Sequence, residues 1–202
     1  MTALEKPRFT SLETYLAAEE TAPYKSEYHA GEVVAMAGAS DAHNLIMANI
    51  IRLLGNAVLD RNCTVRASDQ RVHLADSERY VYPDATVVCG PAEFRPEPRP
   101  ATLLNPTVVV EVQSESTAGR DRGEKLLFYL RIPSLRHYVL VDSQRQRIEV
   151  YSRADAAATQ WTYQVLEAAE AVAELAAIGA GLRLAEVYRN VELGPPPPST
   201  LP

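Results

Sequence analysis

The segment 107-TVVVEVQ-113 is predicted to be an interior β-strand that contains one acidic residue, Glu111. Its β-branched apolar residues follow Pro106 and precede a polar segment, which is typical of a buried strand. An ionised carboxylate in such a strand is costly unless another group compensates its charge. Because folding alone would favour another valine, we expect Glu111 to be kept for a ligand, and a metal ion is the first candidate.

A second strand is predicted just upstream, in 82-YPDATVVC-89. Proline has no amide donor, so Pro83 places Asp84 at the end or the edge of that strand. Side chains alternate along a strand, so Glu111 and Gln113 point to the same face of theirs. If the two strands are neighbours, the carboxylates of Asp84 and Glu111 converge. With a main-chain carbonyl they would supply the oxygen ligands that Mg²⁺ prefers.

The remaining pattern alternates helices and strands. Ser11 and Ser40 are predicted N-caps, the first of a helix over 11–20 and the second of a helix of about 20 residues. Asp121 and Glu124 resemble a capping box that opens a helix over 122–131. A β-hairpin is predicted over 26–37, further strands near 63–74, 136–142, 147–152 and 160–166, and a short helix near 184–189. This order favours the α/β class, with a mixed sheet flanked by helices and additional antiparallel hairpins.

Composition sets broad limits on location and partners. The chain has 202 residues, 47% of them hydrophobic, which fits one domain over residues 1–193 and a disordered proline-rich tail over 194–202. No apolar run approaches the ~20 residues of a membrane span, and the N-terminus does not resemble a secretory signal, so we expect a cytoplasmic protein without a membrane partner. A net charge of −6 argues against a nonspecific nucleic-acid binder. Cys63 and Cys89 are expected to be reduced thiols.

Taken together, the motifs resemble the PD-(D/E)XK nuclease signature, and more closely the Uma-two family of restriction-endonuclease-like proteins. The resemblance covers roughly residues 8–193, and each motif alone is weak. The matching residues are 31-GE-32, His43, 82-YPD-84, 87-VVC-89, 105-NP-106, 111-EVQSEST-117, 121-DRGEK-125, Tyr129, 133-PSL-135, 138-YVLV-141 and the stretch 182–188.

The resemblance implies a restriction-endonuclease-like core, usually dimeric, in which Asp84 and Glu111 bind Mg²⁺ or Mn²⁺. Such enzymes hydrolyse DNA phosphodiester bonds by attack of a metal-activated water. Gln113 stands where the signature lysine belongs, so the resemblance assigns that role to Lys125 on the following helix. The leading hypothesis is therefore a Mg²⁺-dependent endonuclease that acts on DNA as a homodimer. The alternative is a catalytically inactive nuclease-fold module for DNA binding or assembly, which Gln113 and the acidic net charge favour.

Simpler roles remain open for the main site residues. Glu111 could pair with an arginine such as Arg66 or Arg71, and Asp84 could be a turn residue after a proline. Lys125 could be a solvated lysine paired with Asp121. Gln113 could order a water or could be an exposed amide.

Accessory residues are also open to two interpretations. Glu27 and Glu32 flank the predicted hairpin turn, where each could add a metal ligand or be solvated. His43 lies in the first turn of its predicted helix, where local packing competes with a role in the site. Asp121 could be an N-cap or a ligand. Tyr129 shares a helix face with Lys125 at the i, i+4 spacing.

Overall fold

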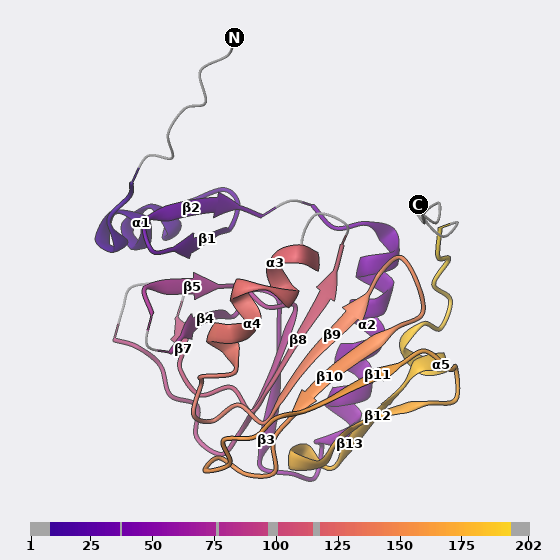
Figure 1. Ribbon diagram of the computed structural model, residues 1–202. Coiled ribbons are helices and arrows are strands. Elements are labelled where there is room, and N and C mark those ends of the chain that lie inside the picture. The colour runs from indigo at the N-terminus through magenta and orange to yellow at the C-terminus, as the bar shows by residue number, and fades with distance from the viewer. Residues whose placement is uncertain (1–8, 37, 76, 97–100, 115–117, 195–202) are drawn as a thin grey trace, which may run out of the picture.

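The computed structural model describes residues 9–36, 38–75, 77–96, 101–114 and 118–194, apart from the side chain of Arg120 (Figure 1). The predicted disordered tail falls almost entirely on residues 195–202, which lie outside the described residues.

A six-stranded mixed sheet forms the centre of the fold. In it β8 and β9 pair parallel, and the other neighbouring strands pair antiparallel. The predicted strands therefore form the expected α/β arrangement, and the fold class is confirmed. In spatial order the strands are β11 (Thr162–Leu166), β10 (Ile148–Ser152), β9 (His137–Asp142), β8 (Val108–Gln113), β6 (Ala85–Cys89) and β3 (Cys63–Ala67).

Helices cover both faces of this sheet (Figure 1). α2 (Asp41–Ala57) packs on one face through Ile46, Ile50 and Leu54, which are fully buried, and its predicted N-cap Ser40 accepts a hydrogen bond from the amide of His43. Each such buried aliphatic side chain contributes roughly 1.5–3 kcal/mol. The other face is covered by α3 (Ala118–Arg122) and α4 (Glu124–Tyr129). The alternation along β8 sends Val108, Val110 and Val112 towards α2, and Val109 towards α4.

A five-stranded sheet packs beside the central one. Its hairpin turns at Ala30-Gly31 as predicted, with positive φ angles of 49° and 104°. α1 (Leu12–Glu19), capped by Ser11 as predicted, stacks Tyr15 on Tyr28. In spatial order the strands are β2 (Glu32–Ala35), β1 (Ser26–His29), β5 (Arg79–Val81), β4 (Arg71–Leu74) and β7 (Thr102–Leu103).

The C-terminal part forms a further hairpin that the sequence patterns did not predict. β12 (Val172–Leu175) and β13 (Ala180–Arg183) pair antiparallel, with the 3₁₀ helix η1 (Ala176–Ile178) between them, and α5 (Leu184–Val187) follows. Alanine and glycine dominate this stretch, and both are poor indicators of strands. Packing against the central sheet overrides this weak local preference, since Leu175 and Leu182 are fully buried in the same cluster as α2.

Two predictions about local structure are wrong. The single helix over 122–131 is broken at Gly123, whose ψ of −116° is not helical, so Asp121 lies inside α3 and is not an N-cap. Cys63 and Cys89 are joined by a disulfide, because β3 and β6 place them directly opposite each other. Spacing along the chain carries no information about that register. Among the described residues, no helix is long and apolar enough to cross a membrane.

His137 is a buried histidine that holds the C-terminal hairpin to the sheet. Its Nε2 accepts a hydrogen bond from the amide of Ala177 (3.1 Å), so its Nδ1 carries the proton and donates to Ser152 Oγ (2.8 Å). Burial and the nearby Arg136 lower the pKa of His137 to about 4. The neutral ring is therefore the form that the fold requires.

Acidification is predicted to destabilise the protein through His137. Because its folded-state pKa lies below the unfolded value of 6.5, the unfolded chain takes up the proton first as the pH falls. The stabilisation is complete above pH ~6.5 and is lost towards pH 4, by roughly 3 kcal/mol at about 1.4 kcal/mol per pKa unit. Urea unfolding of the wild type and His137→Asn between pH 7.5 and 4.5 measures this. The wild type should lose more stability than the variant, and equal losses would contradict the prediction.

Candidate active site

The register of the central sheet brings Asp84 and Glu111 together. Ala85 pairs with Val110 across β6 and β8, so continuing the antiparallel register by one residue sets Asp84 opposite Glu111. Opposite residues of an antiparallel pair point to the same face. Pro83 and Asp84 directly precede β6. The backbone pairing of β6 and β8 ends at Ala85 and Val110, and next to it Asp84 Oδ2 accepts a hydrogen bond of 2.7 Å from the amide of Val112. The two acids therefore lie near each other at this end of β8, where the charge of Asp84 acts on Glu111.

Glu111 is buried, with 5% of its surface exposed, and is compensated from α4. Its Oε1 lies 2.9 Å from Nζ of Lys125 and accepts a hydrogen bond of 2.8 Å from the hydroxyl of Tyr129. The i, i+4 spacing of Lys125 and Tyr129 places both on the helix face that covers β8. The alternative pairing with Arg71 is wrong, since that guanidinium donates to Thr102 Oγ1.

Lys125 is also buried, with 6% exposed, so its interpretation as a solvated lysine is wrong. Its ammonium lies 3.0 Å from Glu27 Oε1, 2.9 Å from Glu111 Oε1 and 3.4 Å from Asp121 Oδ1. Burial by itself lowers the pKa of Lys125, but these carboxylates outweigh burial and raise that pKa above its ordinary range. The side chain is therefore a permanent cation.

Glu27 reaches the site from β1, in the other sheet. Its Oε1 accepts a hydrogen bond of 3.3 Å from the amide of Tyr82, and its Oε2 lies 3.1 Å from Nε2 of His29. Burial by itself raises its pKa, but the Lys125 ammonium and the contact with His29 outweigh burial and lower the pKa of Glu27 to about 2. Its carboxylate is thus buried and faces an ammonium, so its interpretation as a solvated side chain is wrong, and its role as a metal ligand stays a prediction.

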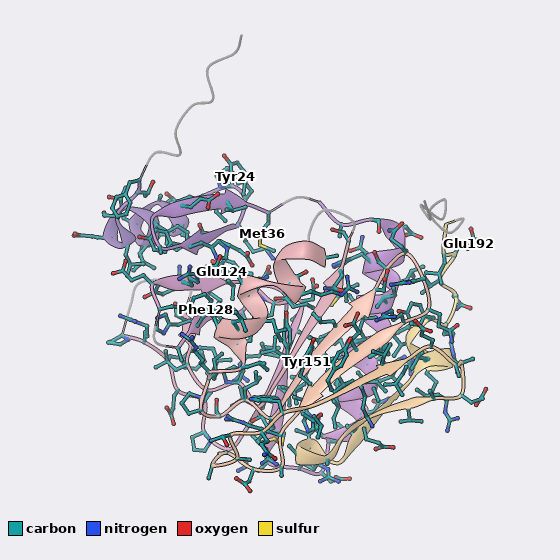
Figure 2. The ribbon with its side chains drawn as sticks, in the orientation of Figure 1. Tyr24, Met36, Glu124, Phe128, Tyr151 and Glu192 are labelled. Atoms are coloured by element: carbon teal, nitrogen blue, oxygen red, sulfur yellow. A yellow bond between two sulfur atoms is a disulfide. The ribbon has the colours of Figure 1, made fainter. Side chains whose placement is uncertain are left out.

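Arg79 of β5 attaches the same sheet to α4. Its Nη2 contacts Glu124 Oε1, and its guanidinium carbon lies 4.0 Å from the centre of the Phe128 ring. Figure 2 shows Glu124 and Phe128 on α4, on the side next to the five-stranded sheet. Lys125 is therefore carried by a helix that contacts both sheets.

Three further candidate residues are His43, Gln113 and Glu32. Nε2 of His43, at the start of α2, lies 3.3 Å from Asp84 Oδ1. Burial by itself lowers the pKa of His43, but the contact with Asp84 outweighs burial and raises that pKa. Gln113 is only 2% exposed, so its interpretation as an exposed amide is wrong, and its Oε1 is buried without a hydrogen-bond partner in the described part of the chain. Glu32 is exposed on β2, which agrees with its interpretation as a solvated side chain, and it lines a cavity of about 50 Å³ together with Lys125.

Acidic side chains gather around Lys125 and Glu111. Three carboxylates, those of Glu27, Glu111 and Asp121, contact the ammonium of Lys125, and Asp84 adds its charge to the field at Glu111. Burial and the three other acids raise the pKa of Glu111 well above its usual range, although Lys125 opposes this. Among the described residues, the charge of Glu111 is therefore only partly compensated, and a cation beside it would add to that compensation.

The donor set fits a hard cation. Asp84 and Glu111 offer carboxylate oxygens, and an ionised carboxylate has about four acceptor positions, so both retain capacity beyond their present contacts. Within the described residues, no group of three or more His, Cys, Asp or Glu side chains could hold a metal by itself. An ion at Asp84 and Glu111 would therefore depend on water for its other ligands, as Mg²⁺ commonly does and zinc in structural sites does not.

Some of this site could not be found from the sequence. The meeting of Glu27 with Lys125 depends on the pairing of β1 with β5, at Tyr28–Tyr80 and His29–Arg79, and no spacing along the chain indicates it. The burial of Gln113 has a sequence signal, because it occupies the same strand face as Glu111.

Replacing Lys125 by methionine is predicted to destabilise the fold by about 3–5 kcal/mol at pH 8, because it leaves buried carboxylates without their counter-ion. The loss should shrink at pH 5.5, where those carboxylates can take up protons. Urea unfolding measures both values. The matched control is Lys25→Met, which removes an ion pair to the exposed Asp69 and should cost at most about 1 kcal/mol. A Lys125→Met variant as stable as the control at pH 8 would contradict the prediction.

Comparisons with known proteins agree with the sequence resemblance. Two proteins of Synechocystis sp. (strain ATCC 27184 / PCC 6803 / Kazusa) are similar to the chain. "Uncharacterized protein sll1609" is 40% identical over 139 residues, which cover 69% of this chain and 78% of that protein. "Uncharacterized protein slr1290" is 32% identical over 183 residues, which cover 90% of this chain and 92% of that protein.

A solved structure shares the fold. It is the crystal structure of "a putative nuclease belonging to DUF820" from Anabaena variabilis ATCC 29413, with a TM-score of 0.69, 18% identity, and coverage of 89% of this chain and 97% of that chain. The restriction-endonuclease-like core expected from the sequence is thereby confirmed as a fold. Residues 12–186 match the Uma2 family, described as "Putative restriction endonuclease". Because that match spans most of its length, the chain belongs to the Uma2 family.

Proposed function

We propose that this protein is a divalent-metal-dependent endonuclease that hydrolyses DNA phosphodiester bonds, with Mg²⁺ or Mn²⁺ held by Asp84 and Glu111. One observation carries the proposal: the register sets the carboxylates of Asp84 and Glu111 near each other at the ends of adjacent strands, with a buried ammonium 2.9 Å from Glu111. Membership of a family described as a restriction endonuclease supports the nuclease class.

The side chains of the site have distinct roles in this proposal. When bound, the cation would activate a water and offset the phosphate charge. The amide of Val112 and the ring of His43 orient the Asp84 carboxylate, and the hydroxyl of Tyr129 orients that of Glu111. These contacts hold the two acids in place before substrate arrives, which lowers the cost of ordering them.

Lys125 acts as an electrostatic stabiliser in this scheme. Because its carboxylate neighbours raise the pKa of Lys125, its ammonium keeps its proton and does not serve as a general base. A fixed positive charge in a water-poor site stabilises the charge that develops on the phosphoryl oxygens. Gln113 is neutral and cannot supply that charge, so Lys125 of α4 supplies it in this proposal.

Nicking of supercoiled plasmid with Mn²⁺ or Mg²⁺ tests the reaction. Asp84→Asn, Glu111→Gln and Lys125→Gln are each expected to lower the rate at least about a hundredfold, since each removes a charge that the transition state needs. The matched control is Asp69→Asn, whose side chain is 90% exposed in the β3–β4 turn, and it should cleave like the wild type. Equal background in the wild type and Glu111→Gln, with every divalent metal, would refute catalysis and favour the inactive module.

Calorimetric titration with Mn²⁺ tests the metal site separately from turnover. The affinity should rise with increasing pH, because the raised pKa of Glu111 means that a proton competes with the ion. Asp84→Ala should weaken binding at least about tenfold, which is 1.4 kcal/mol. Binding that is independent of pH and of Asp84 would place the ion elsewhere. The homodimer implied by the family resemblance stays a prediction, and sedimentation velocity would decide it.

A further inference from the structure

The ammonium of Lys125 stands between the proposed metal ligand and a carboxylate of the other sheet. Nζ is 2.9 Å from Glu111 Oε1 and 3.0 Å from Glu27 Oε1, so the two acids hold it at nearly equal distances. A divalent cation on Glu111 would repel this ammonium and compete for the same carboxylate. Two other carboxylates contact Lys125 and can keep it in place when Glu111 binds the ion, and Glu27, at 3.0 Å against 3.4 Å for Asp121, is the nearer.

Glu27 has the geometry for that task. Its Oε1 already takes Lys125 and the amide of Tyr82, and its Oε2 faces Nε2 of His29. These contacts direct both oxygens to partners within the protein. The carboxylate is 7% exposed and sits on a strand paired with β5, so its position does not depend on Lys125 alone.

We infer that Glu27 is a positioning residue, the counter-ion that retains Lys125 beside the site when Glu111 binds a divalent cation. The inference rests on the proposed metal at Asp84 and Glu111. It makes the β1–β2 hairpin a functional part of the site, because Glu27 belongs to its first strand. Without Glu27, the ammonium would stay on Glu111 and exclude the ion more strongly.

A double-mutant cycle read by Mn²⁺ calorimetry separates this role from the others. Glu27→Gln should weaken Mn²⁺ binding about tenfold in the wild-type background and less than about threefold in Lys125→Gln, because its effect passes through the ammonium. An equal loss in both backgrounds would identify Glu27 as a direct ligand and overturn the inference. Unchanged affinity in both would identify a merely structural ion pair and also overturn it.

The control is Glu20→Gln, which removes an exposed carboxylate at the end of α1 and should leave Mn²⁺ affinity unchanged. If Lys125→Gln does not fold, the ¹H–¹⁵N signal of the Lys125 ammonium decides the question. With saturating Mg²⁺, that signal should persist in the wild type and be lost to exchange in Glu27→Gln. Persistence in both would overturn the inference.

Failure of the inference can be told apart from failure of the proposed function. Coupling between Glu27 and Lys125 without any DNA cleavage removes the proposed reaction and leaves the positioning role standing. Cleavage without coupling removes the positioning role alone. Absence of Mn²⁺ binding to the wild type overturns both.

Discussion

The structure depends on how the charge of Glu111 is compensated inside the central sheet. Taking a carboxylate and an ammonium out of water costs more than a surface ion pair returns, and well-packed apolar residues of similar size would often be as stable. Here Lys125 and Tyr129 approach the buried carboxylate from one helix face, within 2.9 and 2.8 Å. The fold therefore keeps a buried ion pair that stability alone does not favour. This cost is the physical reason for assigning the pair a chemical role.

Contacts of Lys125 and Arg79 connect the two sheets. Lys125 binds Glu111 in the central sheet and Glu27 in the five-stranded sheet, while Arg79 ties β5 to Glu124 and Phe128 on α4. These contacts link the two sheets through α4. A separate cluster of Tyr15, Tyr28 and Tyr80 packs α1 against β1 and β5. A change in the hairpin can therefore reach the acids of the central sheet through a single ammonium.

The signature that the sequence resembles has a lysine where this chain has Gln113. In our proposal the ammonium of Lys125, on the following helix, takes the role of that lysine. That ammonium is held by carboxylates of both sheets, Glu111 of the central sheet and Glu27 of the five-stranded sheet.

Local patterns were sufficient for the strands that carry Asp84 and Glu111, for the caps Ser11 and Ser40 and for the hairpin at Ala30-Gly31, because each depends on periodicity, a side-chain cap or a turn residue near in the chain. They were insufficient for the break at Gly123, the hairpin of β12 and β13 and the bond between Cys63 and Cys89. The presence of two acids and a lysine could be read from the chain. Their convergence with Glu27 could not, because strand order and register arise from packing between segments far apart in sequence, and only the folded chain sets them.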